Sequence, residues 1–407
     1  QQIVNGVGLR SSLLHGLAAV ACLAVVFAAE GAPAAAELPD RVSRILTAHG
    51  ISAEDFSAVV QRVGAPAPLL AVNADRLRNP ASTMKLLTTF IALESLGPDF
   101  RWHTQAWTDG TLTDGRLDGD LYLKGYGDPY MVVERFWLFL RQLRQRGLRA
   151  IDGDLGIDNS YFEVPKTDPG VFDGQALRTY NVVPDALLVN FQAINFVFRP
   201  DPAANRVRII ADPLPANLDI RNGLTLGTGR CGGYQNGIVV AVDNGPEPDR
   251  VTFSGRFAGA CREYRMSRAL LNAPTYAYGV FRSLWEEGGS SIGGNLRVGP
   301  VPDTAVLFHE IRSVPLGEVI RSINKWSNNV MARHLLLTVG AERFGAPATV
   351  DKGRRAAMEF LAARGLDFPG LRIDNGAGLS RDARLSAGGL ARLLLAADRS
   401  LYRAEFV

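Results

Sequence analysis

The sequence has little cysteine, little histidine and almost no net charge. Its 407 residues include 3 cysteines and 5 histidines, and 44 basic residues nearly balance 41 acidic ones, for a formal net charge of +3. This balance, without a lysine- or arginine-rich run, gives no support for a nucleic-acid partner. The histidines lack metal-ligand spacing and no His-Glu-x-x-His occurs, so we expect no metal site.

Long apolar runs are also lacking, apart from one near the N-terminus. Arg10 precedes an apolar run from about residue 13 to residue 29, and small residues follow in Ala34-Ala35-Ala36. A short apolar run before an A-x-A sequence is typical of a secretory signal peptide. We therefore expect residues 1–36 to be a cleaved signal that exports the protein to the periplasm or another extracytoplasmic compartment. A short membrane anchor is the alternative.

Removal of this signal would also remove Cys22 and leave two cysteines, Cys231 and Cys261. An even pair in an exported protein favours one structural disulfide. Two unpaired buried thiols are the alternative. Neither cysteine has a nearby histidine that would indicate nucleophilic chemistry.

The chain after the signal changes its pattern twice. Residues 37–98 predict a helix, a pair of strands between residues 56 and 72, and then a long apolar helix. Residues 99–300 contain short strand-like runs separated by Gly, Asp, Asn and Pro, with one clear amphipathic helix over 132–145. Helical periodicity returns over residues 301–407.

Paired strands followed by a long buried helix predict an antiparallel sheet with helices packed against it, which is an α+β fold. We expect residues 37–98 and 301–407 to form one discontinuous domain of this kind. Residues 99–300 are then a β-rich insertion, divided into two subdomains.

The first candidate site is Ser82-Thr83-Met84-Lys85, at the start of the long apolar helix. Positions i and i+3 are neighbours on a helix, so Lys85 lies beside Ser82 and can take the proton that a serine hydroxyl must lose to become a nucleophile. The helix N-terminus also favours an oxyanion. The alternative is an N-capping serine with a solvated lysine.

The second candidate site is Ser327-Asn328-Asn329, a polar loop between two predicted helices. Here a hydroxyl can relay a proton between Lys85 and a leaving amine, while an amide side chain donates to a substrate carbonyl. The alternative is that Ser327 or Asn328 caps the second helix.

Together the two motifs are typical of penicillin-binding proteins and serine β-lactamases. Their wording resembles the low-molecular-mass D-alanyl-D-alanine carboxypeptidase/endopeptidase family, the class C penicillin-binding proteins of the S13 serine peptidase type. The resemblance covers essentially the whole mature chain, and 245 positions separate Ser82 from Ser327, as the large insertion of that family requires. It rests on the runs Asn79-Pro80-Ala81-Ser82-Thr83-Met84-Lys85, Gly125-Tyr126-Gly127-Asp128-Pro129, Ser327-Asn328-Asn329-Val330-Met331-Ala332 and Asp374-Asn375-Gly376-Ala377-Gly378-Leu379-Ser380-Arg381.

This resemblance implies a transpeptidase-like catalytic domain in which Ser82 is the acylated nucleophile. Lys85, uncharged in its cleft, takes the proton of the Ser82 hydroxyl, and Ser327 passes a proton to the departing amine. Asn329 orients the peptide. Arg381 meets a carboxylate of the substrate, since arginine suits planar bidentate contacts; a surface salt bridge is the alternative for Arg381.

The partners that the resemblance implies are peptidoglycan stem peptides ending in D-Ala-D-Ala, or their cross-links. β-Lactam antibiotics are expected to acylate Ser82 as covalent inhibitors, and the implied reaction needs no cofactor. The sequence leaves open a homodimer and the balance between carboxypeptidase and endopeptidase action.

The third motif of the family, Lys-Thr-Gly on a sheet strand, does not occur in the sequence. That strand supplies one oxyanion-hole N–H, and loss of one such donor typically costs about 10²–10³ in rate. Because the chain ends on the apolar pair Phe406-Val407, we expect the sequence to be part of a longer protein; the alternative is a truncated, inactive one. A serine β-lactamase and a non-catalytic peptidoglycan-binding protein remain rival hypotheses.

Overall fold

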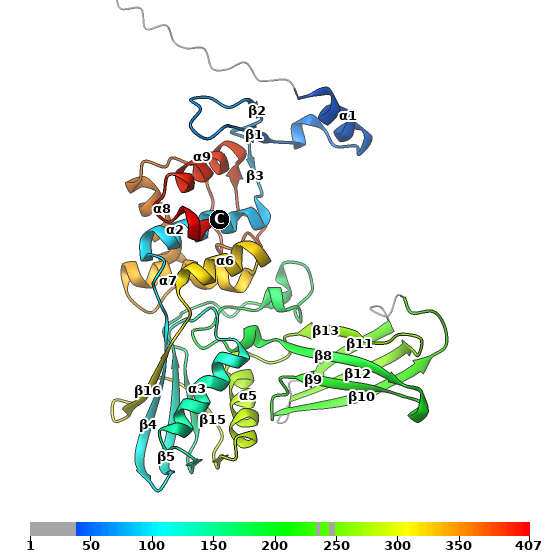
Figure 1. Ribbon diagram of the computed structural model, residues 1–407, viewed down its shortest axis with the longest axis vertical. Coiled ribbons are helices and arrows are strands. Elements are labelled where there is room, and N and C mark those ends of the chain that lie inside the picture. Colours follow the sequence, from blue (N-terminus) through cyan, green and yellow to red (C-terminus); the bar gives the residue numbers. More distant parts are fainter. Residues whose placement is uncertain (1–37, 233–236, 244–248) are drawn as a thin grey trace, which may run out of the picture.

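A computed structural model describes residues 38–232, 237–243 and 249–407 (Figure 1). The predicted signal peptide, residues 1–36, lies outside the described residues. Within the described part of the chain, no helix is long and apolar enough to span a membrane. The described chain mixes α-helices with β-sheets, as predicted.

Six helices surround one hydrophobic core, and we call this part of the protein the helical lobe. Its core residues lie between Met84 and Trp102 and between Leu316 and Phe406, the two ends of the sequence that were predicted to pack together. The helices are α2 (Met84–Leu96), α6 (Leu316–Trp326), α7 (Asn329–Phe344), α8 (Val350–Ala363), α9 (Ala387–Asp398) and α10 (Arg403–Phe406).

Helices α2 and α7 form the centre of this lobe. Nine of the 13 residues of α2 and eleven of the 16 residues of α7 are buried. A helix that is apolar on all sides must lie inside a protein rather than on its surface. The N-terminus of α2 and the loop before α7 carry the two candidate motifs, so both motifs belong to the most buried helices of the lobe.

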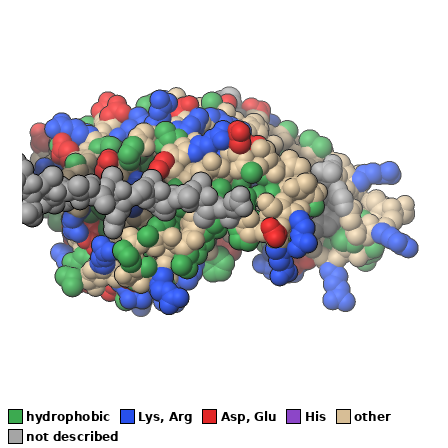
Figure 2. All heavy atoms as spheres, turned by 90° about the horizontal axis from the view of Figure 1, so that it is seen from above, with side chains coloured by type: hydrophobic (Ala, Val, Ile, Leu, Met, Phe, Trp, Pro, Cys, Tyr) green, Lys and Arg blue, Asp and Glu red, His purple; other side chains and the backbone are tan. Residues whose placement is uncertain are grey.

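Two small sheets complete the helical lobe, next to α9. Strands β1 (Ala58–Val60) and β2 (Leu70–Val72) pair antiparallel, which confirms the predicted strand pair. Strand β3 (Leu77–Arg78) pairs with β17 (Leu385–Ser386), and helix α1 (Asp40–Ala48) precedes them. On the face of this lobe seen from above, Lys and Arg side chains are interspersed with Asp and Glu and form no single basic patch (Figure 2).

A second core lies between Ala106 and Ile311, and we call this part the inserted lobe. It contains a seven-stranded sheet against which α3 (Val133–Gln145) and α5 (Ala273–Glu287) pack (Figure 1). The strands are β4 (His103–Thr113), β5 (Arg116–Gly125), β6 (Ala150–Ile151), β7 (Leu155–Asp158), β14 (Ser291–Ile292), β15 (Leu296–Val298) and β16 (Val306–Arg312). Strand β16 lies beyond residue 300 and yet pairs with β4. The domain limits at residues 99 and 300 stay a prediction.

Two three-stranded sheets face each other in the rest of the inserted lobe. The first contains β8 (Ile194–Asp201), β9 (Arg206–Asp212) and β13 (Tyr264–Arg268). The second contains β10 (Leu218–Gly227), β11 (Ile238–Asp243) and β12 (Asp249–Ala258). Phe196 and Phe198 of the first sheet pack edge-on against Phe253 of the second, with ring centroids 4.8 and 5.2 Å apart.

Cys231 and Cys261 lie within disulfide-bonding distance at the end of these sheets, with their Cα atoms 4.9 Å apart. A cross-link over 30 positions restricts the unfolded chain and stabilises the folded one by about 3 kcal/mol. We therefore expect reductant to lower the urea midpoint of unfolding, measured by circular dichroism. A Cys231→Ala/Cys261→Ala variant should start at the lower midpoint and not respond to reductant. An unchanged midpoint of the wild type would contradict a stabilising disulfide.

The two lobes meet at a buried histidine. His334 of α7 is fully buried, and its Nδ1 lies 3.0 Å from the carbonyl oxygen of Gly127 in the inserted lobe. Gly127 has φ +83°, and a Cβ there would come within 2.3 Å of the Phe162 ring, so only glycine fits. Burial lowers the pKa of His334 from 6.5 to about 4, so the neutral imidazole is the folded form.

Because the unfolded chain binds a proton at His334 below pH 6.5 and the folded chain does not, this residue should make stability fall as pH decreases from 6.5 to 4. The full loss is on the order of 3 kcal/mol. Asp128, whose pKa is raised by burial to about 6, acts in the opposite direction. Unfolding should therefore be measured against pH in the wild type and in His334→Asn, which keeps a donor for Gly127. Parallel curves for the two proteins would contradict this assignment.

Candidate active site

Ser82 lies in a single 3₁₀ turn, Ala81–Thr83, that leads directly into α2. Side chains fix this turn: the Asn79 Oδ1 accepts from the Ala81 N–H at 2.9 Å, and the Thr83 hydroxyl donates to the Pro80 carbonyl at 2.6 Å. The Ser82 side chain is exposed and caps no N–H of α2. The N-capping alternative for Ser82 is therefore wrong.

Lys85 lies one helical turn along α2, directly beside the serine. Its Nζ donates to the Ser82 Oγ at 3.2 Å and to the Ala377 carbonyl oxygen at 2.7 Å. The side chain is only 2% exposed, so the solvated-lysine alternative is also wrong. Among the described residues no carboxylate forms an ion pair with it. Burial, assisted by the charge of Arg333, lowers the pKa of Lys85 to about 8.

The loop between Asp374 and Arg381 provides a second hydrogen-bond acceptor for Lys85. Ala377 supplies the carbonyl that accepts from Lys85, and the Thr88 hydroxyl of α2 anchors the loop by donating to the Gly376 carbonyl at 2.7 Å. Gly378 has φ +76°, and a Cβ there would meet the Ala81 carbonyl oxygen at 1.7 Å. The glycine therefore allows the loop to pass directly behind the serine turn.

Ser327 connects α6 to α7 in a left-handed conformation, φ +55°. Asn328, not Ser327, caps α7, since its Oδ1 accepts from the Met331 N–H at 3.0 Å. Ser327 lines a pocket of about 230 Å³ together with Ser82 and Lys85. Within the described chain its hydroxyl forms no direct hydrogen bond with Ser82 or Lys85. The three polar side chains therefore line one pocket, and Ser327 is not in contact with the other two.

Asn329 and Arg381 do not line this pocket. Asn329 begins α7, and its side-chain amide donates to the Tyr180 carbonyl at 3.2 Å. The Arg381 guanidinium lies 4.4 Å from the centre of the Phe172 ring and donates to the Phe172 carbonyl at 3.3 Å. The structure thus brings three of the predicted site residues together and holds the other two against the inserted lobe.

Sequence reasoning missed Asn324, which lines the same pocket. The Thr89 hydroxyl donates to its Oδ1 at 3.2 Å, and its Nδ2 donates to the Phe406 carbonyl at 3.1 Å, so the amide is held in one orientation. Asn324 lies three residues before Ser327, and helical spacing places such residues on the same side of α6. This spacing was the sequence signal that could have identified it. The Ala377 carbonyl was also missed, because a backbone group leaves no mark in the residue pattern.

The whole described chain matches one family of proteins. Residues 38–406 match the model of the D-Ala-D-Ala carboxypeptidase 3 (S13) family. The chain belongs to this family, which confirms the resemblance noted in its motifs.

Two relatives are similar in sequence. The chain is 26% identical to the D-alanyl-D-alanine carboxypeptidase DacB of Haemophilus influenzae over 303 residues, covering 74% of this chain and 62% of that protein. It is 27% identical to the D-alanyl-D-alanine carboxypeptidase of Actinomadura sp. (strain R39) over 329 residues, covering 77% of this chain and 59% of that protein. The chain therefore spans about 60% of the length of these relatives.

The fold is similar to that of a solved structure. The crystal structure of penicillin binding protein 4 (dacB) from Haemophilus influenzae superposes with a TM-score of 0.72 at 21% identity, covering 86% of this chain and 76% of that one. A second structure of that protein, complexed with a novel β-lactam, gives a TM-score of 0.68 at 20% identity, covering 86% and 75%. These likenesses confirm the predicted fold class.

Proposed function

We propose that this protein is a serine-type D-Ala-D-Ala carboxypeptidase and DD-endopeptidase that acts on peptidoglycan stem peptides and their cross-links. The observation that carries the proposal is the contact of 3.2 Å between the Lys85 Nζ and the Ser82 Oγ, made by a buried lysine with a lowered pKa. A nucleophile next to a base of this kind is the arrangement that acyl transfer requires.

The reaction begins when uncharged Lys85 takes the proton of the Ser82 hydroxyl. The freed oxygen attacks the carbonyl of the penultimate D-alanine, and the Ser82 N–H, in the turn that leads into α2, stabilises the resulting oxyanion. Ser327, on the other side of the pocket, passes the proton to the departing amine. Water then hydrolyses the acyl-enzyme, with Lys85 again accepting a proton.

Substrate binding is assigned to Asn329 and Arg381. Asn329 orients the peptide backbone, and Arg381 meets a carboxylate of the stem peptide at the exposed edge of the inserted lobe. Because such substrates lie outside the cytoplasm, we also propose that the protein is exported. The approach of Cys231 to Cys261 supports this location, since disulfides persist in oxidising compartments.

The test is to incubate the purified protein with a fluorescent penicillin and to locate the label by mass spectrometry. A stable adduct on Ser82, together with release of D-alanine from a D-Ala-D-Ala peptide, is the expected result. Rapid release of hydrolysed penicillin would instead favour a β-lactamase. A folded protein without any adduct would refute both enzymatic functions for this chain and favour a peptidoglycan-binding role.

A further inference from the structure

The seven-stranded sheet of the inserted lobe has a second face, on the side away from its core. Ala106, Leu121 and Leu155 of this sheet belong to the same core as α3 and α5. Because successive side chains of a strand point to opposite faces, the residues between them point away from these two helices. We call this second surface the outer face, and its partly or fully exposed residues include Gln105, Trp107, Lys124, Leu307 and Glu310.

One amide fixes two aromatic rings on the outer face. The Gln105 Oε1 accepts from the Trp107 Nε1 at 3.1 Å and from the Tyr126 hydroxyl at 2.9 Å. The amide itself is held by Glu310, to which its Nε2 donates at 2.9 Å. Both rings remain partly exposed, and Leu307, opposite Trp107 on β16, adds an apolar side chain that is 44% exposed. Rings held in this way can bind a ligand without first losing side-chain freedom.

The charges of the outer face nearly balance one another. Each of three carboxylates has a basic partner: Glu310 has His103 at 2.9 Å and Arg312 at 3.6 Å, Asp158 has Lys124 at 3.1 Å, and Asp120 has Arg297 at 2.7 Å. Asp109, beyond Trp107 on β4, forms no ion pair among the described residues. A surface of this kind does not select a polyanion or a polycation. Its carboxylates, amide and basic groups offer acceptors and donors to an uncharged ligand with hydroxyl groups.

A sugar chain matches both properties of this surface. One side of a sugar ring carries mainly C–H groups, which pack against aromatic rings, while its rim carries hydroxyl groups for hydrogen bonds. Trp107 lies opposite Tyr122, which is four residues before Tyr126, so about 13 Å of strand separates the positions of the two rings. A ligand that covers both rings is therefore an extended chain of sugars rather than a single sugar.

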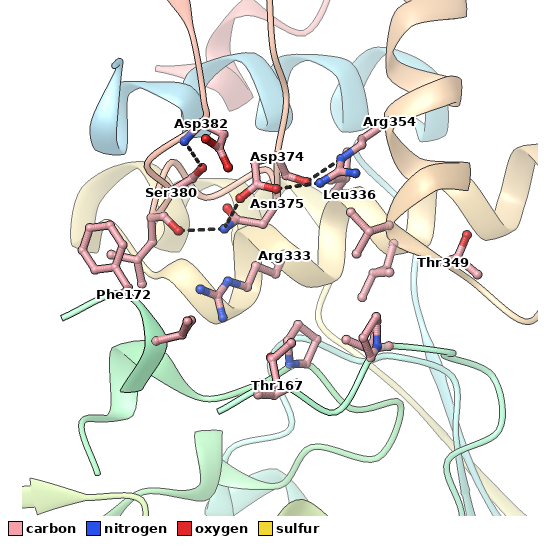
Figure 3. A pocket seen from close by; sticks show the side chains of 18 of the residues that line it. Thr167, Phe172, Arg333, Leu336, Thr349, Arg354, Asp374, Asn375, Ser380 and Asp382 are labelled. Atoms are coloured by element: carbon pink, nitrogen blue, oxygen red, sulfur yellow. Dashed lines mark hydrogen bonds and ion pairs between the residues drawn. The ribbon is translucent and has the colours of Figure 1, made fainter. Parts of the chain in front are cut away.

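The outer face continues to the cleft between the two lobes. The Tyr126 ring packs against the Tyr161 ring, with centroids 5.2 Å apart. Two residues further along the chain, Glu163 lines a cavity of about 860 Å³ between the lobes (Figure 3). Arg381, to which the proposed function assigns the stem-peptide carboxylate, lines the same cavity. In peptidoglycan each stem peptide is attached to a glycan strand at its amino end, away from the bond that is cut. A glycan strand on the outer face would thus lie next to the cleft that takes its peptide.

We propose that the outer face binds the glycan strand of peptidoglycan, with Trp107 and Tyr126 as the rings on which sugars stack. The bound strand holds polymeric substrate in place while a stem peptide enters the cleft. Glycan binding stands on the chemistry of the outer face, whereas its effect on D-alanine release rests on the proposed function.

Binding is tested by calorimetric titration of the purified protein with chitotetraose, a soluble tetramer of N-acetylglucosamine. We expect the wild type to bind and Trp107→Ala to bind about tenfold more weakly, because a stacking ring is lost. Trp137→Ala makes the same change at an exposed residue of α3, on the other side of the sheet, and should bind like the wild type. Absence of binding by the wild type, or equal losses in the two variants, would overturn the site.

Leu307→Arg obstructs the outer face without removing a ring. Because Leu307 is exposed on β16, at the edge of the sheet, the variant should keep the urea midpoint of the wild type. We expect its affinity for chitotetraose to fall about fivefold or more. Wild-type affinity in the folded variant would overturn the site. A dimer in sedimentation velocity that Leu307→Arg dissociates would also overturn it, since the face would then bind a second copy of this chain.

The role in catalysis is tested with two substrates. In Trp107→Ala, D-alanine release from insoluble peptidoglycan should slow about tenfold. Release from a soluble D-Ala-D-Ala peptide, and penicillin acylation of Ser82, should stay unchanged. Equal slowing on both substrates, or no slowing on peptidoglycan, would overturn the role of the outer face. A wild-type protein that releases D-alanine from neither substrate would refute the proposed function, and the titration with chitotetraose would still decide the glycan site.

Discussion

Ser82→Ala is expected to abolish the covalent penicillin adduct and to lower D-alanine release on the order of 10⁴-fold or more. The reason is that the Ser82 hydroxyl, which accepts from the Lys85 Nζ at 3.2 Å, is the proposed nucleophile, and without it no acyl-enzyme can form. Acylation kinetics with a fluorescent penicillin and a D-alanine release assay measure the two effects.

A matched control separates chemistry from folding. Ser43→Ala makes the same change at an exposed position of α1 and should leave both rates unchanged. Because the Ser82 hydroxyl caps no N–H, Ser82→Ala should unfold at the same temperature as the wild type. An adduct that persists in Ser82→Ala at the wild-type rate would show that another residue is the nucleophile.

The contact between Ser82 and Lys85 could be predicted because its geometry is local. A helix places residues i and i+3 side by side, so the spacing of Ser82 and Lys85 was sufficient to predict their contact. The Ala377 carbonyl, 292 positions away, depends on how a loop packs behind α2, and no residue pattern encodes that. It could not be predicted either that Lys85 forms no ion pair with a carboxylate of the described residues, because this is a property of the packed structure.

The surroundings of Arg381 and Arg333 also could not be predicted from the sequence. Arg381 attracted attention because it ends a family motif, but the structure holds it on the Phe172 ring rather than beside Ser82. Arg333 lies near the start of a predicted helix, where an arginine normally indicates a solvated face. Only the packing of the inserted lobe against α7 makes its charge half-buried.

For the fold, composition and periodicity were enough to predict the helices toward the two ends of the chain and the many short strands between them, but they missed α5 in that middle region. They were not enough for the order of the strands. Strand β10 pairs parallel with β12, while β11, between them in sequence, pairs antiparallel on the far side of β12. Strands separated by similar turns do not reveal their order in the sequence pattern. The order depends on which strand faces pack together in the fold, and here these faces include Phe253 and Val251.

The charge of Arg333 and the burial of Lys85 both lower the pKa of Lys85. Both disfavour the ammonium form of the lysine, and among the described residues no acid offsets them through an ion pair with Lys85. The hydrogen bond to the Ala377 carbonyl keeps the amine directed at Ser82. A lysine with a pKa of about 8 is partly deprotonated near neutral pH, which is the condition that the proposed general-base role requires.

The acylation rate is therefore expected to rise with pH through a midpoint of about 8. Below the midpoint Lys85 is protonated and cannot accept the Ser82 proton, so the rate should fall tenfold per pH unit; above it the rate should level off. Stopped-flow acylation with fluorescent penicillin between pH 5.5 and pH 9.5, on the order of four pH units, covers both limbs.

Two variants test whether Lys85 causes this profile. Lys85→Met fills the same buried space without an amine, and Lys85→Arg keeps a permanent charge; each should lower acylation about 10³-fold or more and lose the rise near pH 8. Lys352→Met, at an α8 lysine that donates to the Gly345 carbonyl outside the site, should retain the rise. A profile that keeps its midpoint in Lys85→Met would assign the titration to another group. The Ala377 carbonyl directs the Lys85 amine at Ser82. A Lys85→Met protein that folds normally but fails to acylate would therefore identify the Lys85 Nζ as the base.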